Sequence, residues 1–297
     1  MSTLAQSLVG RDYLRCRDLT AEEALAVLDR AVELRAEPKQ PLLAGATLGL
    51  YFAKHSTRTR ISFTAGMTQL GGSAMALAPE ELQLSRGESL PDTARALSRY
   101  LDVLAVRTFE HSELEEWAEW ATIPVINALT ADEHPCQALA DALTIRDRLG
   151  SLQGVKVAWV GDGSNVLTSL AELGRLLGYE VVAACPPGYE SPGLVDATLR
   201  DPREVVRGAD VVVTDTWISM GQERERLQRL LDLGPYRLDA DLLALAAPGA
   251  FVMHCLPAHP GEEITQDVLY GERSAIWDEA ENRLHVQKAL LCLLLGA

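Results

Sequence analysis

The sequence contains few cysteines, and they follow no pattern that builds a covalent or metal-bound framework. Five cysteines are spread over 297 residues, and no two of them form a CxxC pair. A disulfide framework or a zinc ribbon needs paired or regularly spaced cysteines, so neither is expected. Free thiols are usual in a reducing compartment. We therefore expect a cytoplasmic protein.

Long hydrophobic runs and an excess of positive charge are also missing. The longest apolar run, around residues 289–295, is far shorter than the ~18 residues of a membrane span. The first sixteen residues contain no apolar signal core. The formal net charge is −15, whereas nucleic-acid-binding proteins usually carry a basic face. We expect neither a membrane nor a nucleic-acid partner, although this balance still permits a local cationic site for a small anion.

Hydrophobic periodicity alternates between strand and helix, without a short repeat or a low-complexity tract. In the first half it predicts strands over residues 47–53, 102–107 and 123–128, and helices over 20–35, 59–70 and 135–149. After a break at 150–154 it predicts strands over 155–161, 180–185, 210–215 and 250–255, and helices over 168–177, 239–246 and 279–295. Two capping boxes, Thr20 with Glu23 and Ser112 with Glu115, predict helix starts.

Repeated β–α alternation is typical of parallel sheets covered by helices. Two such runs predict an α/β protein with two doubly wound parallel-sheet domains and an active site in the cleft between them. We expect domains at residues 1–149 and 150–278, with a C-terminal helix over 279–297 that packs back on the first domain. In such sheets ligands bind beyond the carboxyl ends of the strands, which is where the polar motifs below lie.

The first motif is a polar, cationic segment, STRTR at residues 56–60, between a predicted strand and a helix. The N–H groups and the dipole at a helix N-terminus attract anions. Hydroxyls and a guanidinium fork add hydrogen bonds that match phosphate oxygens. No Walker lysine loop is present, so a nucleoside triphosphate is not indicated. The alternative is a polar helix cap with surface arginines.

Two further strand ends carry complementary groups. Arg107 ends the next strand, and His134 and Gln137 begin the helix after a third strand. His134 and Gln137 are three residues apart and share a face of that helix. His134 alone is equally consistent with a helix-cap histidine. Together with Arg58, these residues predict a site for a small dianion with a polarised carbonyl.

The second half begins with a loop that partly matches a dinucleotide fingerprint. The segment GDGSNV at 161–166 follows a strand, but Val166 replaces the third glycine. No acidic residue ends the second strand, which finishes at Cys185-Pro186. The pattern therefore disfavours NAD binding. We expect the loop to present Asn165 to a polar ligand.

Two more loops follow strands in this half. In DTWISMG at 215–221, Asp215 can hold an ammonium group and the backbone of 219–221 can meet a carboxylate; the alternative is a turn with a packed tryptophan and methionine. In HCLP at 254–257, Cys255 is either a nucleophile or a buried, inert thiol. The nearby residues His254, His259, Glu262 and Glu263 match no zinc-binding spacing, so we expect no metal.

Taken together, these segments resemble the ornithine carbamoyltransferases. The matching segments are STRTR (56–60), VRTFEH (106–111), HPCQ (134–137), GDGSN (161–165), DTWISMG (215–221), MHCLP (253–257) and ENR (281–283). They occur in the family's order and spread over essentially the whole chain. STRTR and HPCQ resemble transcarbamylases generally, whereas DTWISMG and HCLP resemble the members that use ornithine rather than aspartate.

The resemblance implies which residues bind each substrate. It implies that the domain at 1–149 binds carbamoyl phosphate through Ser56, Thr57, Arg58, Thr59, Gln83, Arg107, His134 and Gln137, and that Cys255, Leu256 and Arg283 join them from later in the chain. For ornithine, in the domain at 150–278, it implies Asn165, Asp215, Ser219 and Met220. Among these it implies catalytic roles for Arg58, Arg107, His134 and Cys255. It implies a homotrimer, or a multiple of trimers, in which a neighbouring subunit lends Gln83 to the site, and it implies no cofactor.

The implied reaction transfers the carbamoyl group of carbamoyl phosphate to the δ-amine of L-ornithine, giving citrulline and phosphate in arginine biosynthesis. Three positions depart from the family pattern, at Thr64, Ser73 and Ser164. Only Ser164 touches the ornithine segment. The alternatives are a transcarbamylase for putrescine, an acylated ornithine or aspartate, and a non-catalytic anion-binding protein of the same fold.

Overall fold

A computed structural model describes residues 7–54, 56–191, 193, 195–218 and 223–297. The chain forms two compact units, unit 1 with residues 1–140 and 282–297 and unit 2 with residues 141–281. The division falls within the helices α6 (Pro135–Leu149) and α12 (Ile276–Leu295). We retain boundaries after residues 149 and 278 as a proposal, because they lie at the end of α6 and in the first turn of α12. Each unit is described by itself.

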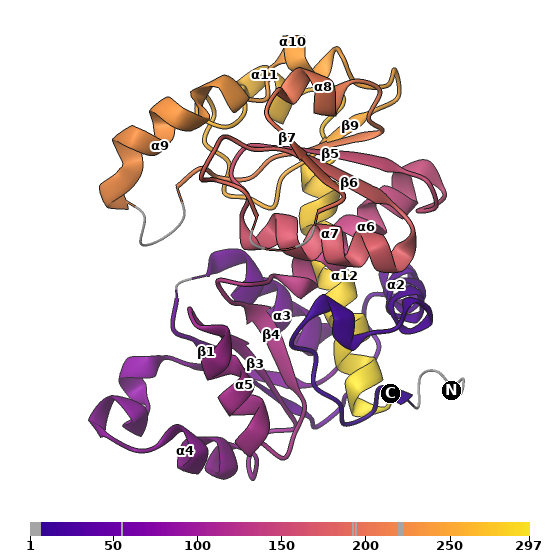
Figure 1. The fold of residues 1–297 in the computed structure, drawn as a ribbon. Coiled ribbons are helices and arrows are strands. Elements are labelled where there is room, and N and C mark those ends of the chain that lie inside the picture. The colour runs from indigo at the N-terminus through magenta and orange to yellow at the C-terminus, as the bar shows by residue number, and fades with distance from the viewer. Residues whose placement is uncertain (1–6, 55, 192, 194, 219–222) are drawn as a thin grey trace. The chain divides into compact units, whose positions relative to one another are not determined.

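Unit 1 is built on a four-stranded parallel sheet with the strand order β2-β1-β3-β4. Its strands are β1 (Thr47–Phe52), β2 (Ser73–Leu77), β3 (Val103–Arg107) and β4 (Val125–Leu129). Its other helices are α2 (Ala21–Ala36), α3 (Thr57–Gln69), α4 (Leu90–Leu97) and α5 (His111–Trp120), with 3-10 turns η1 (Cys16–Asp18), η2 (Pro79–Glu81) and η3 (Gln83–Arg86). Helices cover both faces of the sheet (Figure 1). The strand order reverses between β1 and β3, which makes the end of these strands the favoured place for a ligand.

Unit 2 is built on a five-stranded parallel sheet with the strand order β7-β6-β5-β8-β9. Its strands are β5 (Lys156–Val160), β6 (Glu180–Ala184), β7 (Ala197–Leu199), β8 (Val211–Val213) and β9 (Phe251–Met253). Its helices are α7 (Asn165–Leu177), α8 (Pro202–Val206), α9 (Arg226–Leu233), α10 (Ala240–Leu243) and α11 (Gln266–Leu269), with 3-10 turns η4 (Glu223–Glu225) and η5 (Gly234–Tyr236). Helices again lie on both faces (Figure 1). Here the order reverses between β5 and β8.

The prediction of an α/β protein with two doubly wound parallel sheets is confirmed. The strands are rich in valine, leucine and alanine and are mostly buried on both faces, as expected of sheets covered by helices. The capping box at Thr20 is also confirmed, because Glu23 N donates to Thr20 Oγ1 at 3.2 Å and Thr20 N donates to Glu23 Oε2 at 2.9 Å. None of the helices in the described part of the chain is long and apolar enough to cross a membrane.

Other expectations about element boundaries were wrong. Ser112 is not a cap: α5 already begins at His111, and the N-cap residue Glu110 makes no side-chain capping bond. The helices α3, α7 and α12 each begin two or three residues earlier than expected, so both Thr57 and Asn165 are first helical residues. The elements β2, β7, α4, α8, α9 and α11 were not predicted. They have eight residues or fewer, which is too short for a clear hydrophobic period.

The C-terminal helix is joined to the rest of unit 1 by a buried lysine. Lys288 is fully buried, and its ammonium group donates to Leu34 O at 3.1 Å, Pro38 O at 2.7 Å and Gln69 Oε1 at 3.0 Å. Leu34 lies in the last turn of α2, where backbone carbonyls lack helical partners and a cation is favoured. One side chain thus satisfies acceptors on α3 and on α2 and the segment that follows it.

We predict that Lys288→Met lowers the free energy of unfolding by about 3 kcal/mol. A methionine fills a similar volume but leaves buried carbonyl acceptors without a donor, and each such loss costs about 1–3 kcal/mol. Urea denaturation checks the value, with the exposed Lys39→Met as the control. Equal stability of the two variants would show that the three hydrogen bonds of Lys288 contribute nothing net.

Candidate active site

The STRTR segment lies directly after β1, where α3 begins. Ser56 is the N-cap residue of α3, but its side chain makes no capping bond to that helix. Instead, Arg107 Nη1 at the end of β3 donates to Ser56 Oγ at 3.5 Å. The pairing of β3 with β4 shifts register between Val106 and Arg107, and such an irregularity re-aims the side chain at the strand end. The neighbouring ends of β1 and β3 therefore bring Arg107 to the first turn of α3.

The end of β4 and the helix α12 add further groups in unit 1. His134 precedes α6, and its carbonyl accepts from Gln137 N at 2.9 Å. Arg283 of α12 donates through Nη2 to Thr59 Oγ1 at 2.5 Å, in the first turn of α3. His134, Gln137, Arg283 and Thr59 are all at most 3% exposed. We call Arg58, Thr59, Arg107, His134 and Arg283 the cationic site.

Burial and the positive charge of the cationic site both affect the pKa of its histidine. Burial lowers the pKa of His134 well below its usual value, and the guanidinium groups of Arg283, Arg107 and Arg58 lower it further. His134 is thus a neutral imidazole that can donate one hydrogen bond without adding charge. Three guanidinium groups around a neutral donor fit a phosphate dianion and the oxygen of a carbonyl group that is attached to that phosphate.

Two residues of unit 1 were not expected as the structure has them: Lys54 was not predicted to lie near the site, and Gln83 was predicted to belong to it. Lys54, which the sequence analysis did not single out, lies beside the cationic site: burial and then Arg107 lower its pKa to about 8, and its Nζ lies 3.3 Å from the centre of the Phe109 ring. Its only sequence signal is a place two residues before STRTR. Gln83 is exposed in η3, and no described hydrogen bond joins its side chain to the cationic site.

In unit 2, one carboxylate joins the loops that follow three neighbouring strands. Asp215, after β8, is 5% exposed. Its Oδ2 accepts from Ser164 Oγ at 3.2 Å, in the loop after β5. Its Oδ1 accepts from Cys255 Sγ at 3.1 Å, in the loop after β9, and from Thr216 N at 2.7 Å. We call Asp215 with these three donors the acidic site.

The donors of the acidic site are neutral, and this defines its chemistry. Burial raises the pKa of the Cys255 thiol well above its usual value, and the neighbouring Asp215 raises it further. Cys255 therefore remains a protonated hydrogen-bond donor rather than a thiolate nucleophile. No arginine or lysine is among the described hydrogen-bond partners of Asp215, so this carboxylate can pair with an ammonium group of a ligand.

The glycines of GDGSN serve the fold of unit 2 rather than a nucleotide. A Cβ on Gly163 would lie 2.2 Å from Ser191 N and 2.6 Å from Tyr189 O, so no side chain fits there. Gly161 has φ +124°, which also favours glycine. The loop therefore gives no support to dinucleotide binding, because Gly163 accommodates the neighbouring backbone of residues 189–191.

An arginine that the sequence analysis missed ties two of the site loops together. Arg229 of α9 forms a close ion pair with Asp162 of GDGSN and donates through Nε to Trp217 O at 2.6 Å. Its guanidinium also lies 5.0 Å from the centre of the Tyr189 ring. Burial raises the pKa of Asp162 to about 6, although Arg229 opposes the rise. In the sequence, Arg229 is one of several arginines in a charged stretch, and nothing marks it as buried.

The remaining predicted residues are placed as follows. Asn165 is the first residue of α7, whose N-cap Ser164 accepts from Val166 N at 3.2 Å. Leu256, next to Cys255, has a left-handed backbone with φ +61°. Ser219 and Met220 lie outside the described residues. The structure thus brings Ser164, Asp215 and Cys255 together in unit 2, and Arg58, Thr59, Arg107, His134 and Arg283 together in unit 1.

A metal is not supported by the strongest candidate group. Asp215, His254 and Cys255 offer ligand atoms within 4.8 Å of one another. Both ring nitrogens of His254 are already used, however, because Nδ1 accepts from Leu256 N at 2.9 Å and Nε2 lies 3.3 Å from Glu263 Oε1. Binding a metal would break one of these buried hydrogen bonds.

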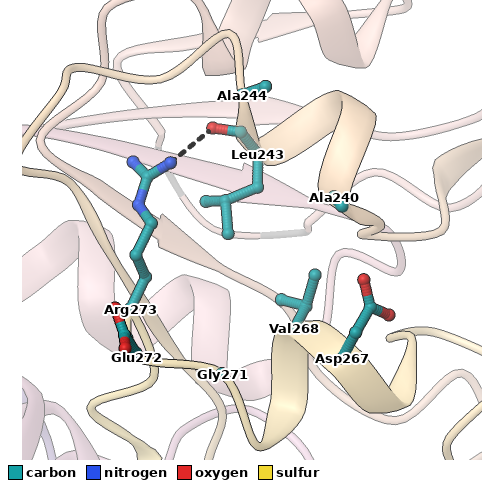
Figure 2. Close-up of a pocket in the computed structure, with 8 residues that line it drawn as sticks. All are labelled: Ala240, Leu243, Ala244, Asp267, Val268, Gly271, Glu272 and Arg273. Atoms are coloured by element: carbon teal, nitrogen blue, oxygen red, sulfur yellow. Dashed lines mark hydrogen bonds between the residues drawn. The ribbon is translucent and has the colours of Figure 1, made fainter.

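A separate pocket in unit 2 contains none of the predicted site residues (Figure 2). It has a volume of about 240 Å³ and is lined by Ala240, Leu243, Ala244, Asp267, Val268, Gly271, Glu272 and Arg273. Its cation is already engaged, because Arg273 donates to Leu243 O at 3.1 Å, Ala247 O at 2.9 Å and Ala250 O at 2.6 Å. Arg273 supports the segment between α10 and β9 and is not directed to a ligand.

The two sheets define a doubly wound α/β protein, with a cationic site in unit 1 and an acidic site in unit 2. The chain belongs to the aspartate/ornithine carbamoyltransferase family. Residues 11–147 match the family's carbamoyl-P binding domain, and residues 153–294 match its Asp/Orn binding domain.

Individual relatives match over almost the whole chain. An ornithine carbamoyltransferase of Prochlorococcus marinus is 50% identical, covering 100% of this chain and 97% of its own length. That of Carboxydothermus hydrogenoformans is 50% identical, covering 97% of this chain and 98% of its own length. The solved structure of the Pyrococcus furiosus ornithine carbamoyltransferase is 46% identical, covers 98% of both chains and has a TM-score of 0.94.

We predict that His134 makes stability fall as the pH drops below about 6.5, the ordinary histidine value. Because the folded-state pKa of His134 is lowered, the unfolded chain binds a proton there that the folded chain does not. The stability of the wild type relative to His134→Gln should therefore decrease by up to about 1.4 kcal/mol per pH unit below this value. Urea unfolding of both proteins from pH 5 to pH 7.5 measures it. Parallel stability curves would contradict a buried neutral imidazole.

Proposed function

We propose that this protein transfers the carbamoyl group of carbamoyl phosphate to the δ-amine of L-ornithine, giving L-citrulline and phosphate. The observation that carries the proposal is the opposite charge of the two sites. The cationic site gathers three guanidinium groups around a neutral His134. In the acidic site, the hydrogen-bond donors to Asp215 among the described residues are all neutral. One suits a phosphorylated donor, and the other suits an acceptor that carries ammonium groups.

On the donor side, the proposal assigns the phosphate to the N-terminus of α3. Backbone N–H groups there, with the side chains of Ser56, Thr57, Arg58 and Thr59, offer donors to a dianion. Arg107 and His134 would donate to the carbonyl oxygen, with Gln137 and Arg283 beside them. When the neutral amine attacks, the C–N bond forms and negative charge grows on this oxygen; the C–O bond to phosphate then breaks, and one amine proton passes to the departing phosphate. Preorganised donors at such an oxygen usually contribute more to the rate enhancement than any other single effect.

On the acceptor side, the proposal assigns an ammonium group of ornithine to Asp215. Asn165 and residues 219–221 would hold the carboxylate, and Cys255 and Leu256 would flank the δ-amine and the carbamoyl group. The attacking amine must be neutral, although a lysine-like amine titrates near ~10.4. The Cys255 thiol cannot act as the base, because its raised pKa keeps it protonated. The site must therefore select ornithine with a neutral δ-amine, while Asp215 pairs with the α-ammonium group.

An acceptor with two carboxylates is disfavoured by the same geometry. Aspartate would place a second negative charge in a site that has Asp215 and neutral donors. A non-catalytic anion-binding protein would have no reason to keep the Asp215–Cys255 arrangement beyond the anion site. Relatives at 50% identity named ornithine carbamoyltransferase support ornithine as the acceptor. We place the reaction in arginine biosynthesis in the cytoplasm.

The direct test compares acceptors under saturating carbamoyl phosphate. L-Ornithine, putrescine, N-acetylornithine and L-aspartate are supplied in turn, and the carbamoylated products are measured. We expect the largest kcat/KM with ornithine, because only ornithine combines a free α-ammonium group for Asp215, a single carboxylate and a second amine that can be carbamoylated. Preference for putrescine or acetylornithine would replace the proposed acceptor. No product with any amine would favour the anion-binding alternative.

We also propose a homotrimer, or a multiple of trimers, in which each site receives Gln83 from a neighbouring subunit. The exposed position of Gln83 in η3 supports this, as does the polar stretch around it. We predict that mixing chains carrying Gln83→Ala with chains carrying Arg107→Ala restores activity after dissociation and reassociation. Some interfaces then pair an intact Gln83 with an intact Arg107.

The outcome depends on whether one subunit lends residues to another. Each variant assembled alone should be nearly inactive, which is the control. Mixed assemblies are verified by mass spectrometry. Absence of recovery in verified mixed assemblies would show that each chain completes its own site, or that Gln83 takes no part in it.

A further inference from the structure

Glu263 is a fully buried carboxylate that the sequence analysis did not assign to either substrate. It lies in the chain segment between β9 and α11. Glu263 is 0% exposed. Its Oε1 lies 3.3 Å from His254 Nε2 and accepts a close hydrogen bond from His259 N. His259 Nδ1 lies 3.6 Å from the same oxygen. Burying a carboxylate is costly unless its hydrogen bonds are used, so a role for Glu263 must be sought through these two histidines.

The first histidine holds the loop after β9. His254 Nδ1 accepts from Leu256 N at 2.9 Å, so this nitrogen carries a lone pair and the ring proton sits on Nε2, facing Glu263. Leu256 has φ +61°, a left-handed conformation that costs a residue with a side chain about 1–2 kcal/mol. Such strain persists only where the surroundings enforce it. Glu263 fixes the tautomer of His254, and His254 fixes the backbone beside Cys255.

The second histidine holds the loop after β8. His259 Nδ1 lies 3.3 Å from Thr216 Oγ1, and Thr216 Oγ1 donates to Ile218 O at 3.4 Å. A hydroxyl has one proton to donate, so His259 Nδ1 must be the donor in its contact with Thr216. The proximity of Glu263 Oε1 favours a proton on that nitrogen. Thr216 directly follows Asp215 and donates its own N–H to that carboxylate at 2.7 Å.

We infer that Glu263 is a positioning residue for the acceptor: through His254 and His259 it sets the loops that carry Cys255–Leu256 and Asp215–Ile218. It acts on ornithine through these two loops, and its described hydrogen bonds lie within unit 2. The inference rests on the proposed function. It also separates His254 from proton transfer, because both of its ring nitrogens are engaged in holding the loop.

The test compares Glu263→Ala with a conservative variant and a neighbouring control. We expect Glu263→Ala to lower kcat/KM for ornithine about 100-fold, since small displacements of positioned groups have effects of this size. Binding of inorganic phosphate to the cationic site should not change. Glu263→Gln keeps an acceptor oxygen for both histidines and should recover much of the loss. Glu262→Ala, which removes the partner of the exposed Arg226, should behave as the wild type.

The outcomes are separable. A wild type that carbamoylates no ornithine overturns the proposed function itself. A wild type that is active, with a folded Glu263→Ala variant of equal kcat/KM for ornithine, overturns the positioning role. Where Glu263→Ala fails to fold, His259→Ala and His259→Asn decide, because asparagine keeps a donor near the position of Nδ1. Raised KM for ornithine in His259→Ala with rescue by His259→Asn supports the inference, and equal KM in both variants and the wild type overturns it.

Discussion

Parallel pairing of neighbouring strands is the constraint on which both sites depend. In a parallel sheet the residues that follow adjacent strands emerge at the same edge, and side chains far apart in the sequence meet there. In unit 1 the adjacent strands β1, β3 and β4 bring STRTR, Arg107 and His134 to one edge. In unit 2 the adjacent strands β5, β8 and β9 bring Ser164, Asp215 and Cys255 to one edge. Neither site is assembled from one continuous segment.

The two sheet edges carry opposite charges: guanidinium groups gather at the edge in unit 1, and a buried carboxylate lies at the edge in unit 2. The guanidinium groups of Arg58, Arg107 and Arg283 repel one another, and after burial they are the further cause of the lowered pKa of His134, so the cluster disfavours another positive charge. A dianion relieves this repulsion, so ligand binding and charge balance favour each other. At Asp215 the problem is a buried anion without a cationic neighbour among its described bonds. Three hydrogen bonds from neutral donors offset part of its desolvation and still leave a charge for an ammonium group.

Much of the fold was predictable from the sequence, because long buried strands and helices have a strong hydrophobic period. The helix over 135–149 was placed to the residue, and the capping box at Thr20 formed as predicted. The short elements were missed because a strand such as β7, with three residues, has no period to detect. Ser112 failed as a cap because capping-box spacing occurs by chance inside first turns. Motif order predicted which site residues meet, since strand adjacency follows from doubly wound topology.

The residues that hold the site loops were harder to predict than those that line them. Arg229 and Glu263 have the composition of surface residues, and only the tertiary structure shows that each is buried and bonded to more than one segment. A buried charge carries no local pattern, because its partners lie far away in the sequence. Lys288 is the same case in unit 1, with acceptors about 220 to 250 positions away. A charged residue can therefore be assigned to the surface only after its tertiary contacts are known.

Ser164 shows how such contacts settle a question that the sequence raised. Ser164 departs from the family pattern in the segment that the resemblance assigns to ornithine, so part of the acceptor contact was in question. In the structure the Ser164 hydroxyl does two things at once: it accepts from Val166 N at 3.2 Å as the cap of α7, and it donates to Asp215 Oδ2 at 3.2 Å. The positive end of α7 polarises this hydroxyl and strengthens its bond to the carboxylate. A short side chain fits this double role because its oxygen stays close to the backbone N–H that it caps. The departure thus retains a donor to Asp215, and it ties the charge of the acidic site directly to the start of the helix that begins with Asn165.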